Sequence, residues 1–269
     1  MSPGDRRPIG VFDSGVGGLT VLRALMARLP GERTVYLGDT ARVPYGTKSA
    51  DVVTRYSVRN AEVLLRHDVK LLVVACNTAS AVALPALAGR LEIPVLGVIE
   101  PGAKAAAAVS RSGRVGVIGT QGTVRSGAYQ RALEAARPGV TVLARACPLF
   151  VPLAEEGWTT GDVPQLAARR YLAELVDGGM DTLVLGCTHY PLLRGVIAEA
   201  VGPEVALVDS AEATAEAVGT LLAGRGELGA GSAPPEHRYL VTDIPERFVD
   251  VAARFLGQPV QSVEQVDIS

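Results

Sequence analysis

Short runs of Val, Ile and Leu are spread along this 269-residue chain, and longer segments with helical periodicity separate them. Most of the runs do not alternate apolar with polar residues, which is typical of strands that are buried on both faces of a parallel sheet. Parallel strands need crossover connections, and the helical segments supply them. The pattern predicts an α/β fold whose sites lie beyond the carboxyl ends of the strands. The strands are expected at 9–12, 34–37, 71–75, 95–99, 115–118, 140–145, 183–185, 205–208 and 239–242, and helices at 18–29, 49–66, 81–90, 125–136, 164–177 and 191–200.

Two of the expected strands have counterparts later in the chain. The segment IGVFDSG, which begins at Ile9, resembles VGVIGTQ from Val115, and LVVACNT from Leu72 resembles LVLGCTH from Leu183. The two offsets, 106 and 111 residues, agree within a short insertion. The repeat predicts two pseudo-symmetric, doubly wound α/β domains with mainly parallel sheets and an active site between them.

Two breaks suggest where these domains begin and end. One lies near residues 99–102 and the other near 209–210, where an apolar run ends. We expect a discontinuous first domain of residues 1–100 plus 210–269, and a second domain of residues 101–209. Segment 224–235, which contains Gly, Ser and Pro, is predicted to be a surface loop. The strand and helix after it are expected to return to the first domain.

Charge and hydropathy exclude several classes of protein. The formal net charge is -2 and no cluster of Lys or Arg stands out, so we expect no nucleic-acid partner. No apolar run approaches the roughly 18 residues of a membrane span, and the polar N-terminus lacks the apolar core of a signal peptide. We therefore expect a cytoplasmic protein without a membrane partner.

Three cysteines offer the first candidates for chemistry. An odd number cannot form a disulfide framework, and Cys76, Cys147 and Cys187 lack the spacing of a zinc site, so no metal is expected. Cys147 has no counterpart in the repeat and is expected to be a packing residue. Cys76 and Cys187 each end an apolar strand and precede a helix, where exposed N–H groups favour a thiolate.

The matched positions of these two cysteines favour a function over burial alone. A single such cysteine is more often a small buried hydrophobic residue, and a cysteine hydrolase needs only one thiol beside a His. Two thiols that face a ligand from opposite halves can remove a proton from one face of a carbon and return one to the other. That sequence inverts the carbon centre and requires one ionised and one protonated sulfur.

The glycine-rich segment DSGVGG, which starts at Asp13, follows the first strand. Its glycines allow backbone N–H groups to approach an anion. A dinucleotide fingerprint, with Asp39 as the ribose acid, would need Gly where Thr20 stands, and Asp13 and Ser14 crowd the pyrophosphate position. A carboxylate or an ammonium group suits this loop better, and a plain tight turn is the alternative.

Five motifs resemble the aspartate/glutamate racemase superfamily, and most closely its glutamate racemases. They are GVFDSGVGGLTV, GDTARVPYG, VVACNTAS, CPLFVPLAEEG and LGCTHYPLL, in the family's order, and the resemblance runs from Ile9 to about Phe255. It implies cofactor-independent interconversion of L- and D-glutamate, which supplies D-glutamate for peptidoglycan and so for cell-wall biogenesis and cell shape. It also implies a homodimer.

The resemblance assigns roles to individual residues. Cys76 is expected to act on the D-glutamate face with Asp13 near it, and Cys187 on the L-glutamate face with His189 near it. Asp39 and Glu155 resemble further family carboxylates, and Glu155 is preferred to Glu156. The substrate contacts are expected to be Asp13, Ser14, Tyr45, Gly46, Asn77, Thr78, Thr120, Thr188 and His189.

Four alternatives remain at this point. An aspartate racemase or another relative would differ in substrate length. A pyridoxal-phosphate racemase needs a Schiff-base lysine, and lysine occurs only at Lys48, Lys70 and Lys104, of which Lys104 is the plausible one. A dinucleotide-dependent oxidoreductase is the third. The fourth is a non-enzymatic role, because some glutamate racemases bind DNA gyrase and inhibit it.

Overall fold

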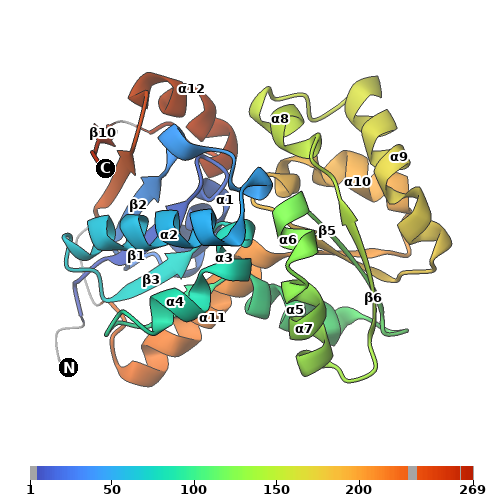
Figure 1. Cartoon of the computed structure of the whole chain (residues 1–269), viewed down its shortest axis with the longest axis horizontal. Coiled ribbons are helices and arrows are strands. Elements are labelled where there is room, and N and C mark those ends of the chain that lie inside the picture. The colour runs from blue at the N-terminus through green and yellow to red at the C-terminus, as the bar shows by residue number, and fades with distance from the viewer. Residues whose placement is uncertain (1–4, 230–234, 261, 269) are drawn as a thin grey trace.

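The computed structural model describes residues 5–229, 235–260 and 262–268, and these form two parallel sheets side by side (Figure 1). Within the described residues, one sheet has six strands in the order β10-β9-β2-β1-β3-β4, and the other has four in the order β6-β5-β7-β8. Every strand pair in both sheets is parallel. The predicted α/β class with parallel sheets is confirmed.

All the predicted strands are present. The first sheet contains β1 (Ile9–Asp13), β2 (Thr34–Gly38), β3 (Leu71–Val74), β4 (Val95–Gly97), β9 (His237–Val241) and β10 (Glu264–Gln265). The second contains β5 (Arg114–Gly119), β6 (Thr141–Ala146), β7 (Thr182–Gly186) and β8 (Ala206–Asp209). Strand β10 was not predicted, because two exposed polar residues carry no apolar pattern.

The two sheets repeat one strand order. The cores β2-β1-β3-β4 and β6-β5-β7-β8 match strand for strand, so β1 corresponds to β5 and β3 to β7. These are the pairs that the sequence repeat relates. Cys76 follows β3 and Cys187 follows β7, so the two thiols stand at equivalent strand ends. In each sheet the strand order reverses at the first strand, and the crevice at such a switch point is where α/β sheets bind ligands.

Helices cover both faces of the sheets. Those in the first half and the C-terminal region are α1 (Leu19–Arg28), α2 (Ala50–Leu65), α3 (Asn77–Val82), α4 (Leu84–Ala88), α11 (Ser210–Arg225) and α12 (Pro245–Leu256). The second half carries α5 (Ile99–Val109), α6 (Gln121–Arg125), α7 (Ala128–Ala136), α8 (Phe150–Glu155), α9 (Asp162–Asp177) and α10 (Arg194–Val201). Short 3-10 turns span Thr40–Arg42, Tyr45–Thr47 and Tyr190–Leu193.

Three predicted helices have different bounds. The helix expected at 81–90 begins at Asn77 and is interrupted at Ala83, before Pro85 enters α4. The one expected at 125–136 is split by Gly127, whose φ of 65° is left-handed and ends a helix. The one expected at 191–200 begins as the 3-10 turn Tyr190–Leu193, with its proline near the start.

The chain passes between the halves at two adjacent places. The strand expected at 95–99 ends at Gly97, because Ile99 already begins α5, and Pro101 fits within the first helical turn. The second passage is at Asp209, whose carboxylate accepts a hydrogen bond from Ala211 N (2.8 Å) and caps α11. A Cβ at Gly102 of α5 would lie 3.0 Å from Cβ of Ser210, so the two passages touch.

One apolar core joins the halves, and two smaller clusters lie one in each half. The shared core contains Leu22 of α1, Ile118 of β5 and Leu222 of α11. The strand expected after the loop at 224–235 is β9, which pairs with β2, whereas residues 230–234 of that loop lie outside the described residues. None of the helices in the described ranges combines the length and apolar character needed to cross a membrane.

Candidate active site

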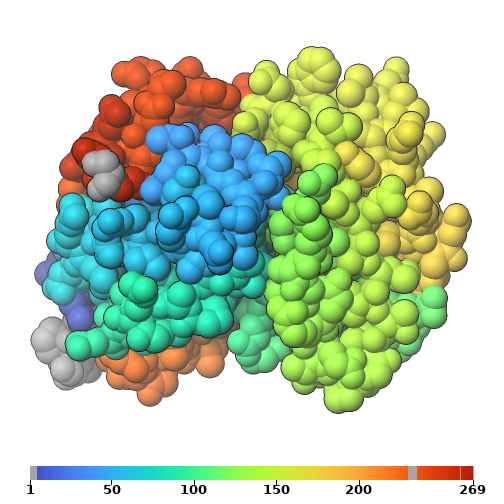
Figure 2. Space-filling view, in the orientation of Figure 1, coloured from blue at the N-terminus to red at the C-terminus, as the bar shows by residue number. Residues whose placement is uncertain are grey.

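Cys76 and Cys187 line one cavity of about 50 Å³ where the two halves meet. The halves adjoin along a seam that is visible on the molecular surface (Figure 2). Segments that follow β1, β3, β5 and β7 contribute to the walls, as the strand-end argument predicted. Of the residues expected at the site, those lining this cavity are Ser14, Tyr45, Gly46, Cys76, Asn77, Thr78, Thr120, Glu155, Cys187, Thr188 and His189; Val43, Pro44 and Val151 also line it.

Cys76 directly precedes α3 and caps it. Its Sγ accepts a hydrogen bond from Ala79 N at 3.5 Å, so the sulfur occupies the cap position of the helix. Sγ also lies 3.8 Å from Oγ of Ser14. Burial, reinforced by the negative charge of Asp13, raises the pKa of the Cys76 thiol to about 12. The sulfur is therefore a protonated thiol at neutral pH.

Asp13, whose charge acts on this thiol, does not line the cavity. The side chain is fully buried, and Oδ2 accepts a hydrogen bond from Gly15 N at 3.0 Å. Among the described residues, Oδ1 has no hydrogen-bond partner. Burial raises the pKa of Asp13. The residue therefore offers a polar oxygen that a bound ammonium group or a moving proton could satisfy.

Cys187 has a histidine beside it in place of the carboxylate. Its Sγ is 3.8 Å from Nδ1 of His189, and Nε2 of His189 is 3.0 Å from Oε1 of Glu155. Burial alone would lower the pKa of His189, but the hydrogen bonds with Cys187 and Glu155 outweigh burial and raise it to about 10. The hydrogen bond from His189 lowers the pKa of Glu155. At neutral pH an imidazolium thus bridges the sulfur and a carboxylate, whereas Glu156 is exposed.

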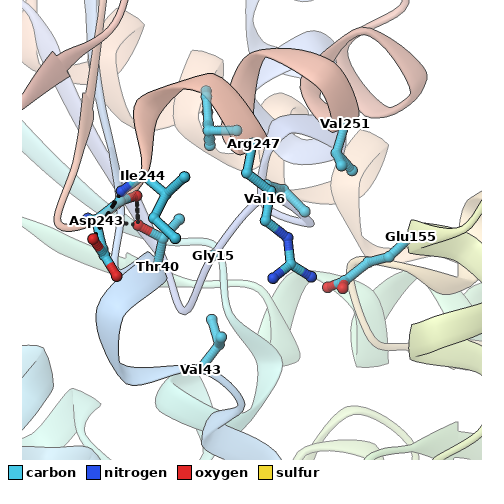
Figure 3. A pocket seen from close by; sticks show the side chains of 10 residues that line it. Gly15, Val16, Thr40, Val43, Glu155, Asp243, Ile244, Arg247 and Val251 are labelled. Carbon is cyan, nitrogen blue, oxygen red and sulfur yellow. Dashed lines mark hydrogen bonds between the residues drawn. The ribbon is translucent and has the colours of Figure 1, made fainter.

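A second hollow of about 160 Å³ adjoins Glu155 and is bordered by α12 (Figure 3). In this view the side chain of Arg247 points toward the carboxylate of Glu155, and its charge helps to lower the pKa of Glu155. Arg254 donates a hydrogen bond to the backbone carbonyl of Glu155. Helix α12 therefore reaches across the seam and holds the end of α8.

Three threonine hydroxyls meet beside the cavity, and Thr78 and Thr120 line it. Oγ1 of Thr78 is 2.9 Å from Oγ1 of Thr120 and 3.2 Å from Oγ1 of Thr123, and the last two are 3.1 Å apart. Gly46 packs on them so closely that a Cβ there would lie 2.6 Å from Cβ of Thr120. Sequence reasoning missed Thr123, because a threonine within a helix carries no distinguishing local signal.

Asp39 lies outside the cavity, within a network of hydrogen bonds in which both of its carboxylate oxygens have partners. Its carboxylate accepts from Nε of Arg42 (2.8 and 2.9 Å), from Oγ1 of Thr242 (3.1 Å) and from the hydroxyl of Tyr45. Asn60 donates to the same hydroxyl at 3.0 Å. Asp39 thus contacts Tyr45, which lines the cavity, and does not itself reach the cavity wall.

Tyr129 contacts a residue of the cavity wall, whereas Cys147 does not line the cavity. The hydroxyl of Tyr129 in α7 donates to Oδ1 of Asn77 at 2.7 Å, and sequence reasoning did not anticipate this contact. Cys147 is fully buried outside the cavity, where burial raises the pKa of its thiol to about 12. The part of the chain that the structure describes contains no candidate metal site. In it, no three His, Cys, Asp or Glu side chains are placed together so that they could hold a metal ion.

Comparison with known proteins identifies the family. The family model described as Asp/Glu/Hydantoin racemase matches residues 17–218. The chain belongs to this racemase family. The recognition made from the five motifs is confirmed, and the protein is an amino-acid racemase, an isomerase.

Relatives of this racemase match it over nearly its whole length. Glutamate racemase of Geobacter metallireducens is 60% identical over 262 residues, which cover 97% of each chain. The crystal structure of glutamate racemase isoform RacE1 from Bacillus anthracis has a TM-score of 0.94 and 41% identity, with 98% of each chain covered. Glutamate racemase from Francisella tularensis, solved in complex with D-glutamate, has a TM-score of 0.92 and 38% identity over 98% of each chain.

Proposed function

We propose that this racemase interconverts L- and D-glutamate without a cofactor, with Cys76 and Cys187 as the two acid–base groups. The observation that carries the proposal is that both thiols, one from each half, border the same cavity at equivalent strand ends. The glutamate racemases at up to 60% identity support the choice of substrate. An aspartate racemase is the alternative.

The surroundings of the two thiols support a sequence of steps for one direction of the reaction. Cys187, beside the His189 imidazolium, acts as a thiolate and removes the Cα proton of L-glutamate: the C–H bond breaks, an S–H bond forms, and the electron pair stays on Cα. Cys76, a protonated thiol, then delivers its proton to the opposite face of Cα. The reverse direction begins at Cys76, and Asp13 and His189 assist proton transfer at their respective sulfurs.

The cavity walls suit an amino acid with two carboxylates. Hydroxyl and amide groups of Ser14, Asn77, Thr78, Thr120 and Thr188 border it, and the carboxylate of Asp13 is buried. Hydrogen bonds to the α-carboxylate would stabilise the charge that spreads into it when the carbanion forms.

A pyridoxal-phosphate mechanism needs a lysine amine at the cavity, and none of the described residues that line it is a lysine. Lys104 pairs with Glu100 at 2.7 Å on an exposed face of α5, and Lys70 pairs with buried Glu32 at 2.7 Å. Neither lines the cavity, and neither does Lys48.

The two thiols at the cavity are almost wholly buried, because Cys76 and Cys187 are each only 6% exposed. We propose that the seam between the halves widens to admit substrate, with the two adjacent passages at α5 and α11 as the hinge. For this reason we retain the division into domains 1–100 plus 210–269 and 101–209.

The biological role that we propose is the supply of D-glutamate for peptidoglycan, by a homodimer in the cytoplasm. A reducing compartment suits the mechanism, because oxidation of either sulfur would remove an acid–base group. Inhibition of DNA gyrase is a separate property of some glutamate racemases. A DNA-supercoiling assay with the Cys76→Ala variant would show whether this protein inhibits gyrase independently of catalysis.

Isotope exchange in D₂O without added cofactor tests the proposal. Starting from L-glutamate, deuterium should appear at Cα of the D-glutamate product before it appears in the remaining L-glutamate, because each face has its own base. Cys76→Ala and Cys187→Ala should abolish racemisation, whereas Cys147→Ala should retain it. Full turnover in either of the first two variants would refute the two-base assignment, and faster turnover of aspartate than of glutamate would favour the alternative substrate.

A further inference from the structure

We propose that Tyr129 is a positioning residue that fixes the side-chain amide of Asn77, so that its NH₂ group is presented to a carboxylate of the substrate. The inference rests on the proposed glutamate racemase function and extends it to a residue in the second half of the chain.

The contact is short, buried and specific. Tyr129 lies in α7, only 1% of its side chain is exposed, and its hydroxyl donates to Oδ1 of Asn77 at 2.7 Å. Asn77 belongs to the first turn of α3, directly after Cys76, and it lines the cavity with 3% exposure. The bond therefore crosses the seam and ends on the neighbour of a catalytic thiol.

In the structure the amide of Asn77 turns Oδ1 toward the tyrosine. The hydroxyl of Tyr129 gives its one proton to Oδ1, and the NH₂ group of Asn77 is the free end of the amide. Within the described residues, Nδ2 is buried and has no hydrogen-bond partner. A buried unpaired donor is costly, and a carboxylate oxygen is the acceptor that would satisfy it best. The opposite orientation would present Oδ1, which repels a carboxylate.

Tyr129 is itself held rigidly as a neutral donor. Burial raises its pKa, so the hydroxyl keeps its proton at any pH at which the enzyme works. A Cβ at Gly186, just before Cys187, would lie 2.9 Å from the tyrosine ring, and one at Gly102 would lie 3.6 Å from its hydroxyl. The ring thus rests where the chain passes between the halves, and its hydroxyl reaches Asn77 on the other side of the seam.

The test combines Tyr129→Phe, Asn77→Ala and the double variant, with Tyr171→Phe as a control. Tyr171 is a half-buried tyrosine of the same half whose hydroxyl accepts from Leu149 N, away from the cavity. We expect Asn77→Ala to raise KM for both enantiomers of glutamate by at least about tenfold, as for the loss of a hydrogen bond to a charged group. Tyr129→Phe should raise KM by about fivefold with a smaller change in kcat, and Tyr171→Phe should leave KM unchanged.

The double variant separates positioning from a general loss of stability. If Tyr129 acts through the amide, adding Tyr129→Phe to Asn77→Ala should not raise KM further. An unchanged KM in Tyr129→Phe, or a KM increase that is fully additive in the double variant, would overturn the inference. Melting temperatures identify a variant that fails to fold, and in that event Asn77→Ala alone must show the KM increase for the inference to stand. Failure of the wild-type protein to racemise glutamate would instead refute the proposed function.

Discussion

The hydroxyl of Thr20 in α1 lies 3.1 Å from the backbone carbonyl of Thr188 and donates to it across the seam. The same hydroxyl is 3.0 Å from the carbonyl of Gly17, so it stands between the loop after β1 and the loop after β7. These two loops, one from each half, therefore pack directly against each other beside His189.

Gly17→Ala should disrupt this packing. A Cβ at Gly17 would lie 2.3 Å from Oγ1 of Thr188 and 2.5 Å from Nδ1 of His189, so the loops must separate and His189 must leave Cys187. We expect kcat to fall by more than tenfold and the free energy of unfolding to fall by about 1–3 kcal/mol, as for overpacked cores. Racemisation assays and urea denaturation would measure both effects.

The matched control for that substitution is Gly195→Ala. Gly195 lies within α10, and a Cβ there would meet no described heavy atom within 4 Å. Alanine is favoured over glycine in a helix by about 1 kcal/mol, so this variant should be active and slightly more stable. A Gly17→Ala enzyme with the wild-type rate would show that the loops can separate without harm.

Alkylation with iodoacetamide should distinguish the three thiols. Burial and Asp13 raise the pKa of Cys76 to about 12, whereas Sγ of Cys187 lies 3.8 Å from Nδ1 of His189. Because the thiolate is the nucleophile, Cys187 should react first at pH 7.5, and modification of Cys76 should accelerate as the pH rises toward 12. Mass spectrometry of peptides after timed quenching would give each rate.

Cys147 provides the internal reference in this experiment, because it is fully buried outside the cavity with a pKa near 12. It should remain unmodified while the protein is folded. The His189→Gln variant should slow the reaction of Cys187 and leave Cys76 unaffected. Equal rates at Cys76 and Cys187 at pH 7.5 would contradict the protonated state assigned to Cys76.

His189 should make stability depend on pH in a defined window. Its pKa is raised in the folded protein to about 10 from an ordinary value of 6.5, so between these values the folded state binds more protons than the unfolded state. Stability from His189 is therefore fully present below about pH 6.5 and is lost as pH rises through about 10. The stability difference between wild type and His189→Gln should shrink over this range in urea titrations.

Glu155→Gln tests the cause of that window. Without the carboxylate, Nε2 of His189 no longer has a charged acceptor, so one of the contacts that raise its pKa weakens and the upper limit of the window should move to lower pH. The racemisation pH profile in the direction that begins at Cys187 should shift the same way. A profile identical to wild type would mean that Glu155 does not influence His189.

The apolar strands and the cysteine pair were predictable because each has a local signal. Runs of branched aliphatic residues indicated every strand except β10, and the similar offsets of Ile9 and Leu72 to Val115 and Leu183 indicated the repeat. The cap of α3 was less predictable. Cysteine is not a typical capping residue, whereas asparagine is, yet the helix is capped by Cys76 and not by the neighbouring Asn77.

The residues that support the site had no such signal. Tyr129 is one apolar position of an amphipathic helix, and its partner Asn77 is 52 residues away in the chain. Arg247 and Arg254 lie on α12, whose approach to Glu155 depends on how the C-terminal region returns to the seam. Contacts of this kind arise only from tertiary packing, which periodicity and residue type do not encode.

Buried Lys70 should matter for stability alone. Its ammonium group pairs with Glu32 at 2.7 Å and donates to the backbone carbonyls of Asp5 and Glu227. Lys70→Met leaves Glu32 buried without its charged partner, with only the hydrogen bond from Gly229 N remaining. We therefore expect a loss of about 3–5 kcal/mol, and the double variant Lys70→Met/Glu32→Leu should recover part of it. Calorimetry would measure the losses, and kcat at 25 °C should not change while the protein is folded.

Asp39→Asn tests whether Asp39 acts on the substrate or through Tyr45. Asparagine keeps the size of the side chain but removes the charge that Arg42 and the Tyr45 hydroxyl contact, so we expect lower stability and a several-fold rise in KM as Tyr45 shifts at the cavity wall. Tyr45→Phe should reproduce the KM increase, and the pH profile of kcat should keep its shape in both variants. If Asp39 exchanges protons with the substrate, Asp39→Asn must instead remove one limb of that profile while Tyr45→Phe leaves it intact, because only a group that changes its protonation state during turnover can set a limb.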